Sequence, residues 1–324
     1  MAPAPPAPEG YRFTVTADEA GQRLDSYLVV REIPHSRSQI KRHLDAGSCL
    51  VNDEAGRPAQ RLKQGDVVNY APPPATASEL RPEHVALAVL YEDDELIVID
   101  KPAGMVVHPA PGHLEGTLVA ALLGHCRQLS GVGGVLRPGI VHRLDKLTSG
   151  VMVATKTDRA HEGLGEQFRR HTIERAYLAL VVGRFATATG SFRTLHGRHP
   201  HDRKRFTSRC ERGRTAITHW RVVEPLPASS LVEARLETGR THQVRVHLAE
   251  HGHQVLGDPL YGGPPADPLL REVGRALQRQ ALHACLLAFV HPVSGAQLSF
   301  ASPLPADMAQ ALARLRAARG GQDG

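Results

Sequence analysis

The stretch His142-Arg143-Leu144-Asp145-Lys146-Leu147-Thr148-Ser149-Gly150 is the most informative part of this chain. It sets a carboxylate, Asp145, among cations in a region rich in positive charge, because residues 141–220 hold 16 Lys and Arg against 7 Asp and Glu. Such a region suits a polyanionic partner, since each neutralised phosphate releases condensed counterions, although a solvated basic surface is the alternative. An anion weakens phosphate binding, so we expect Asp145 to have another task.

Two tasks fit Asp145. As a structural anchor it would form an ion pair with an arginine or cap the backbone at Thr148 and Ser149. As a reactive group it would be a carboxylate kept ionised by the neighbouring cations. The residues alone leave both tasks open.

Two further clusters carry candidate functional side chains. Residues 236–248 turn at Gly239 and then present arginine, histidine and glutamine donors, as an anion site or a base-edge site requires. A helix that packs Val244 and Leu248 inward is an equally good interpretation. In residues 173–180, Tyr177 alternates with apolar neighbours, which is typical of a core position.

Composition sets the broad class. The chain has 324 residues, 41% of them hydrophobic, which allows one large domain and a small one. The four cysteines form no Cys-x-x-Cys pair, which argues against a disulfide framework and a zinc-thiolate site. Residues 1–10 lack a basic and apolar leader, and no run of 18 apolar residues occurs. We therefore expect a cytoplasmic protein without membrane association.

Proline-rich stretches predict the domain boundaries. We expect a disordered tail over residues 1–10, a small domain over 11–70, a linker over 71–84, a large domain over 85–318 and a tail over 319–324. In the small domain, residues 36–47 predict a helix, with a capping box formed by Ser36 and Gln39 and a stop at Gly47. Together with a helix opened by residues 21–25 and strands at 50–52 and 67–70, this resembles the alpha-L RNA-binding domain.

The large domain predicts an α+β fold. Strands are expected at 88–91, 96–99, 140–141, 151–155, 177–182, 218–223 and 231–237, and a helix at 117–125. Many short strands with few helices indicate a mixed, mainly antiparallel sheet.

The clusters, in their order, resemble the RluA family of pseudouridine synthases over residues 11–308. Within that family the likeness is greatest to enzymes of large-subunit ribosomal RNA. The matching stretches are Tyr91-Glu92-Asp93, Asp100-Lys101-Pro102-Ala103-Gly104-Met105-Val106-Val107-His108-Pro109, residues 142–150, Tyr177 before Gly183, residues 239–247, Gly257-Asp258-Pro259-Leu260-Tyr261-Gly262 and Gln280-Ala281-Leu282-His283-Ala284.

The resemblance implies the pseudouridine synthase fold and an isomerase that detaches uracil from C1′, rotates it and rejoins it through C5. It implies no cofactor and no metal. Asp145 is the implied nucleophile, either at C1′ or by assisting removal of the 2′ proton. Tyr177 is expected to stack on the uracil and help to take the C5 proton, and Arg245 to pair with Asp145. Arg143 is the candidate to fill the gap left by a flipped base.

The implied partner is ribosomal RNA or an assembling large ribosomal subunit, bound by a monomer. Residues 198–205 predict a flexible basic loop that contacts phosphates, with an exposed loop of no partner as the alternative. The expected RNA contacts are Arg143, Lys146, Arg240, His242 and Gln243 near the site, Arg203, Lys204 and Arg205 in the loop, and Arg37, Lys41 and Arg42 in the small domain.

Two other functions compete with this interpretation. His247, Glu250 and His251 match the zinc-peptidase pattern His-x-x-Glu-His, although Gly252 would end the helix at once and no third ligand is evident. A non-catalytic RNA-binding or ribosome-assembly factor would lack the key side chains, yet Asp145 and its expected partners are present.

Overall fold

The computed structural model describes residues 10–31, 33, 37–72, 81–109, 115–132 and 137–320. The chain divides into two compact units, Met1–Glu79 with Gly134–Leu136 and Leu80–Gly133 with Arg137–Gly324. Residues 1–9 and 321–324 of the expected tails and Ser36 of the expected capping box lie outside the described residues. No helix in the described ranges is long and apolar enough to cross a membrane.

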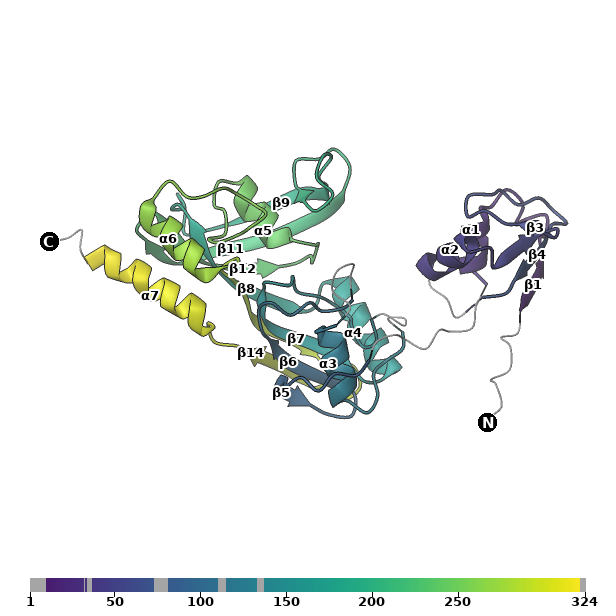
Figure 1. Ribbon diagram of the computed structural model, residues 1–324, viewed down its shortest axis with the longest axis horizontal. Helices are drawn as coiled ribbons and strands as arrows, with labels where there is room; N and C mark the ends of the chain where they lie inside the picture. The colour runs from purple at the N-terminus through teal and green to yellow at the C-terminus, as the bar shows by residue number, and fades with distance from the viewer. Residues whose placement is uncertain are drawn as a thin grey trace. The chain divides into compact units, whose positions relative to one another are not determined.

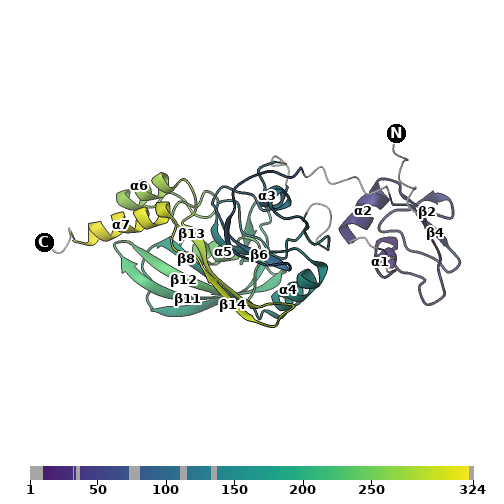
Figure 2. The same ribbon diagram turned by 90° about the horizontal axis from the view of Figure 1, so that it is seen from below.

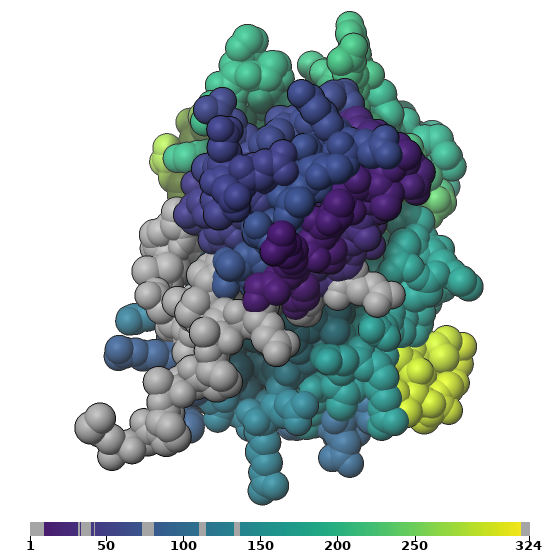
Figure 3. All heavy atoms as spheres, turned by 90° about the vertical axis from the view of Figure 1, so that its right-hand side faces the viewer, coloured from purple at the N-terminus to yellow at the C-terminus, as the bar shows by residue number. Residues whose placement is uncertain are grey.

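The small unit is a four-stranded sheet covered by two helices, and Figure 3 shows one face of it in purple and blue. Leu24, Leu28, Ile40 and Leu44 of the helices pack on Val68 of the sheet. The strand order is β1-β4-β2-β3. The elements are β1 (Tyr11–Thr14), α1 (Leu24–Val29), α2 (Arg37–Asp45), β2 (Cys49–Val51), β3 (Glu54–Ala55) and β4 (Val67–Tyr70). Both expected helices and both expected strands are present.

The large unit is built on a 10-stranded sheet of order β10-β9-β11-β12-β8-β13-β7-β6-β5, with β14 paired to β13 (Figure 1). Its strands are β5 (Ala88–Glu92), β6 (Leu96–Lys101), β7 (Ser149–Thr155), β8 (Glu174–Val182), β9 (Thr189–Arg198), β10 (Phe206–Thr207), β11 (Arg214–Leu226), β12 (Ser229–Leu236), β13 (Leu282–Val290) and β14 (Gln297–Ala301). Among the described strand pairs, all are antiparallel except β7 with β13. The predicted mixed, mainly antiparallel sheet is confirmed.

The expected strand at residues 140–141 is wrong, because this segment makes only an isolated bridge between Ile140 and Ala154. The chain turns there to enter the 142–148 loop and cannot extend a ladder.

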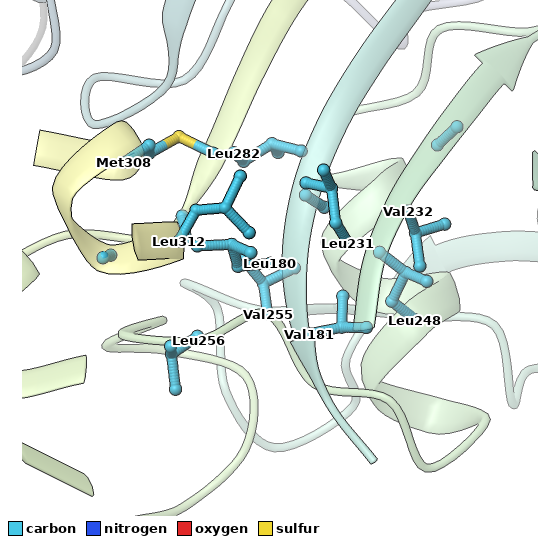
Figure 4. Close-up of a cluster of buried hydrophobic side chains, with 14 of the residues drawn as sticks. Leu180, Val181, Leu231, Val232, Leu248, Val255, Leu256, Leu282, Met308 and Leu312 are labelled. Atoms are coloured by element: carbon cyan, nitrogen blue, oxygen red, sulfur yellow. The ribbon is translucent and has the colours of Figure 1, made fainter. Parts of the chain in front are cut away.

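Helices cover both faces of this sheet (Figure 2). They are α3 (Leu118–His125), α4 (Asp158–Arg170), α5 (Gln243–Glu250), α6 (Pro268–Leu277) and α7 (Ala306–Gly320). Thr117 caps the expected helix α3, because its side chain accepts from the Ala120 N–H. Met308 and Leu312 of α7 lie against strands β8 and β12 through the cluster shown in Figure 4. This core fixes the sheet from which the candidate site is built.

The end of the expected linker belongs to the large unit. Glu83 donates its backbone N–H to the carbonyl of Ala120 at 2.9 Å, and its carboxylate accepts from the Gly116 N–H at 3.0 Å. Gly124 of α3 lets the backbone of Glu83 approach closely, since a side chain there would collide with it. Residues 81–84 are therefore attached to α3.

Candidate functional site

A cavity of about 250 Å³ opens in the large unit. It is lined by the 141–148 loop, by β8 and by the segment that leads into α5. The acidic and arginine side chains of this lining are Asp145, Arg143, Arg175, Arg240 and Arg245. Four guanidinium groups around one carboxylate favour an anionic ligand.

Asp145 lies in the loop before β7, and its side chain is 18% exposed. Lys101 holds the backbone of this loop. Its buried Nζ donates to the carbonyls of Pro102, Met105 and Lys146 at 2.7, 3.1 and 3.4 Å. Burial lowers the pKa of Lys101 to about 7, against the opposing charge of Asp145. The loop backbone is thus anchored to the end of β6, while the carboxylate faces the cavity.

Arg245 of α5 connects two carboxylates. Its Nη1 donates to Asp145 Oδ2 at 2.8 Å, and its Nε and Nη2 donate to the two oxygens of Asp258 at 2.7 and 2.8 Å. Burial opposes the charge of Arg245, but the bonds and charges of Asp258 and Asp145 outweigh it and raise the pKa. The expected contact between Arg245 and Asp145 is present. In the described chain the Asp145 carboxylate does not cap Thr148 or Ser149. Of the two structural contacts expected for Asp145, the ion pair with an arginine is the one that forms.

Gln243 explains how α5 is held. Its side chain is buried, and its Oε1 accepts from the Thr238 hydroxyl and the Arg240 N–H at 2.8 and 2.9 Å. Its Nε2 donates to the Ile217 carbonyl and the Thr218 hydroxyl, both at 3.0 Å. The amide has no capacity left for RNA, so the expected RNA contact at Gln243 is corrected to the anchoring of the turn before α5.

Tyr177 enters the cavity from β8. It pairs with Ala234 of β12 on one side and with Ala284 of β13 on the other. Burial raises the pKa of Tyr177, so the side chain is a neutral phenol. Within the described chain no hydrogen bond involves its hydroxyl, although Arg175 lies two residues earlier on the same face of the strand.

Arg143 precedes Asp145 by two residues, and its side chain is exposed. Its Nη1 is 3.3 Å from Nε2 of His108, a buried side chain. Burial, and then the charge of Arg143, lower the pKa of His108 to about 4. The imidazole is therefore neutral and accepts from the guanidinium, which holds Arg143 at the cavity rim.

Comparison with known proteins identifies the family of this chain. The family described as "RNA pseudouridylate synthase" matches residues 95–250. "Ribosomal large subunit pseudouridine synthase D" of Zymomonas mobilis is 44% identical over 302 residues, which are 92% of this chain and 95% of the relative. The chain belongs to the RNA pseudouridine synthase family. It is therefore an isomerase that converts uridine to pseudouridine in RNA.

Other relatives agree with this assignment. The synthase is 41% identical to "Uncharacterized RNA pseudouridine synthase YlyB" of Bacillus subtilis, over 94% of this chain and 97% of the relative. The solved structure of human RNA Pseudouridylate Synthase Domain Containing 4 matches with 26% identity and a TM-score of 0.56 over 71% of this chain and 93% of that one. The expected fold class is confirmed for the large unit.

The structure brings most of the expected site residues of the synthase to one cavity. Asp145, Tyr177, Arg143, Arg240, His242 and Arg245 all line it. Lys146 is exposed beside it, and Arg203, Lys204 and Arg205 lie in the loop between β9 and β10. Lys41 is exposed on α2 of the small unit, and the side chains of Arg37 and Arg42 lie outside what is described.

Residues 257–262 match the family pattern, but the sequence alone indicates no role for them. In the structure Asp258 orients Arg245, and the ring of Tyr261 lies 5.0 Å from the Arg245 guanidinium. An acidic residue fixed between a glycine and a proline was the available signal, because such a turn holds its side chain rigidly.

The zinc-peptidase pattern is not supported. His247 uses both ring nitrogens, at 2.9 Å from the Thr194 hydroxyl and 2.8 Å from the Thr218 hydroxyl. Glu250 accepts from Thr207 and Ser208. These side chains hold α5 against the neighbouring strands and are not free to bind a metal ion.

Proposed function

We propose that this synthase modifies uridine in large-subunit ribosomal RNA and that Asp145 is its nucleophile. The observation that carries the proposal is the Asp145 carboxylate, held by Arg245 in a cavity whose other charged side chains are arginines. The names of relatives from Zymomonas mobilis and Xanthomonas campestris, "Ribosomal large subunit pseudouridine synthase D", support the choice of RNA.

Asp145 can act by two routes. In the first, a carboxylate oxygen bonds to C1′ as the bond from C1′ to N1 breaks, and uracil leaves as an anion. After rotation, C5 bonds to C1′ and the carboxylate leaves. In the second, the carboxylate removes the 2′ proton as uracil departs. After rotation, C5 bonds to C1′ of the resulting double bond, and the protonated carboxyl returns the proton to C2′. Both routes begin with an ionised carboxylate in contact with the sugar.

The remaining residues have supporting tasks. The isomerisation removes a proton from C5 and delivers one to the nitrogen that left C1′. The neutral Tyr177 phenol can serve both needs if it accepts the C5 proton as its own proton passes to that nitrogen. Its ring provides a surface on which uracil stacks. A uridine within a stem must leave the stack to reach Asp145, and Arg143 at the rim is placed to fill the gap.

RNA outside the cavity is bound by two basic elements in this proposal. One is the loop between β9 and β10, with Arg203, Lys204 and Arg205. The other is α2 of the small unit, which resembles the alpha-L domain and carries Lys41. Neither element contains a candidate nucleophile, so their contribution is affinity and placement.

Chemical mapping of pseudouridine in ribosomal and transfer RNA, from cells with and without the gene, tests the proposal. We expect specific uridines of large-subunit RNA to lose the modification and to regain it when the wild-type gene is restored, but not the Asp145→Asn gene. Loss confined to transfer RNA would contradict the proposed substrate. Restoration by the Asp145→Asn gene would contradict the proposed nucleophile.

A further inference from the structure

His242 lies beside Asp145 but makes no hydrogen bond to it in the structure. Its Nε2 is 3.8 Å from Asp145 Oδ1, which is beyond hydrogen-bond distance. Both side chains line the cavity and are about equally exposed, at 19% and 18%. Contacts between catalytic groups are commonly long in RNA-free or substrate-free enzymes and shorten when the substrate binds.

The other ring nitrogen of His242 has a defined partner. Nδ1 is 2.8 Å from the hydroxyl of Tyr261, and the same hydroxyl accepts from the backbone N–H of Phe206 at 2.8 Å. Tyr261 is 2% exposed, so its hydroxyl proton needs an acceptor inside the protein. Among the described residues, Nδ1 of His242 is the acceptor within reach.

This arrangement determines where the imidazole carries its proton. Phe206 can only donate, so the Tyr261 hydroxyl donates to Nδ1, and Nδ1 is an acceptor without a proton. Burial lowers the pKa of His242, so the ring is neutral and has one proton, which must lie on Nε2. Nε2–H is the group that faces Asp145.

We propose that His242 is a positioning residue, locked by Tyr261 as the Nε2–H tautomer, that donates to Asp145 when RNA fills the cavity. The inference rests on the proposed role of Asp145 as nucleophile. It gives the carboxylate a second donor besides Arg245, on its other oxygen. One oxygen is then held by each donor, which fixes the plane of the carboxylate relative to the ribose.

Two substitutions separate this role from a structural one. In His242→Gln, the amide nitrogen can take the place of Nε2 and still donate to Asp145. In His242→Asn, the shorter amide can reach Tyr261 but not Asp145. His242 has φ +59°, a left-handed conformation that Asn tolerates better than Gln, so folding stability favours the Asn protein.

We expect turnover to follow the opposite order. His242→Gln should stay within a few-fold of wild type, whereas His242→Asn should lose about 10-fold or more in kcat with similar RNA affinity, because one hydrogen bond to a charged group is lost. Thermal unfolding of both proteins shows whether each is folded. Equal turnover of the two variants, or a lower kcat for the Gln protein, would overturn the proposal.

A spectroscopic measurement tests the tautomer without activity. In long-range ¹H–¹⁵N spectra of the full-length protein, we expect His242 to carry its proton on Nε2, and Tyr261→Phe to shift protonation toward Nδ1. Tyr91→Phe is the control, since it removes a hydroxyl that contacts Asp93 in the same unit, far from His242 in sequence. A proton on Nδ1 in the wild type, or no shift in Tyr261→Phe, would overturn the inference and leave the role of Asp145 intact. A role for Asp145 fails separately, if Asp145→Asn stays active.

Discussion

At the scale of single residues, the cavity holds its carboxylate through an arginine that is itself fixed. Asp258 accepts from two N–H groups of Arg245, and a third N–H group, on Nη1, donates to Asp145. Bidentate pairs of this kind define geometry as well as energy. Replacing Asp145 should therefore leave Arg245 in place.

We expect Asp145→Asn to bind RNA within several-fold of wild type and to form no detectable pseudouridine. The amide has the same shape but lacks the nucleophilic charge, and Arg245 keeps both of its bonds to Asp258. Binding is measured by filter retention and product by chemical mapping of the same RNA. Retained turnover would remove Asp145 from the mechanism.

Tyr177→Phe keeps the ring and removes the phenolic oxygen. We expect turnover to slow by about 100-fold or more with near-normal RNA binding, because the proton at C5 loses its acceptor while stacking is retained. Single-turnover assays at saturating enzyme measure this directly. If the rate is unchanged, the oxygen has no part in the chemistry.

His142 links the stability of the site loop to pH. Its Nε2 accepts from the Val153 N–H at 3.1 Å, and burial, with the charge of Arg175, lowers its pKa from 6.5 to about 3. Between those values the unfolded chain binds more protons, so this part of the stability is complete above pH 6.5 and is lost as the pH falls toward 3.

We expect His142→Gln to show a shallower loss of unfolding free energy between pH 6.5 and pH 4 than wild type. Gln can still accept from Val153 but does not titrate. Urea denaturation at several pH values measures the slope, and His84→Gln, at an exposed position, is the control. Parallel curves for wild type and His142→Gln would show that this histidine does not set the acid limit.

At the scale of elements, the basic loop after β9 has more internal order than the flexible loop expected from sequence. His199 donates its N–H to the Arg205 carbonyl at 3.1 Å, and Arg198 Nη1 donates to the Arg203 carbonyl at 2.7 Å. These bonds close the loop at its base. Its cations are therefore presented from a defined turn.

Neutralising Arg203, Lys204 and Arg205 together should weaken RNA binding and flatten its salt dependence. The slope of log affinity against log salt should fall by up to about 2 to 3 units if all three contact phosphates. Binding titrations at several salt concentrations measure the slope.

The matched control replaces three arginines of α6 and α7, Arg275, Arg314 and Arg316, and removes the same charge. We expect the control to change the slope much less, because Arg314 and Arg316 are paired with Glu272 and Glu224. Equal changes in both proteins would mean that net charge alone, and not the loop, determines binding.

The sequence predicted the elements with strong local signals and missed those without them. Strand β6 is a continuous apolar run and α3 has a clear cap, and both lie where expected. Helix α7 was missed although Met308, Leu312 and Leu315 repeat at helical spacing. Strand β9 has mostly exposed or half-buried side chains, so its place comes from the ladder with β11 and not from hydrophobicity.

The candidate site shows the same division. The contact of Arg245 with Asp145 was expected from the family pattern. The role of Asp258 and the use of every hydrogen-bonding group of the Gln243 amide within the protein were not expected. Both depend on which groups tertiary packing brings within reach.

At the scale of the whole molecule, we expect the two units to have separable tasks: the large unit modifies the RNA, and the small unit adds affinity. A fragment beginning at Ser78 keeps Glu83 and its bonds to α3, together with Asp145 and Tyr177. The large unit has its own hydrophobic clusters, so we expect this fragment to fold. It should modify short, concentrated RNA at a rate similar to the full chain and lose efficiency on long ribosomal RNA at low concentration.

Single-turnover assays on both RNAs measure the two tasks. A fragment starting at Val85 is the control for the cut, since it removes Glu83 and should be less stable. If the folded Ser78 fragment were inactive on every RNA, the small unit would belong to the active site.

Strand β13 determines when the catalytic centre can form during synthesis of the chain. Ala284 pairs with Gly150 on one side, where φ +119° and close backbone contact require glycine, and with Tyr177 on the other. β13 thus spaces the loop that carries Asp145 from the strand that carries Tyr177. It is translated more than 100 residues after both, so a nascent chain cannot assemble its catalytic centre until synthesis is nearly finished. Premature termination between residues 262 and 281 should yield a protein that still holds Asp145, Tyr177 and Arg245 but lacks the strand that spaces the Asp145 loop from Tyr177.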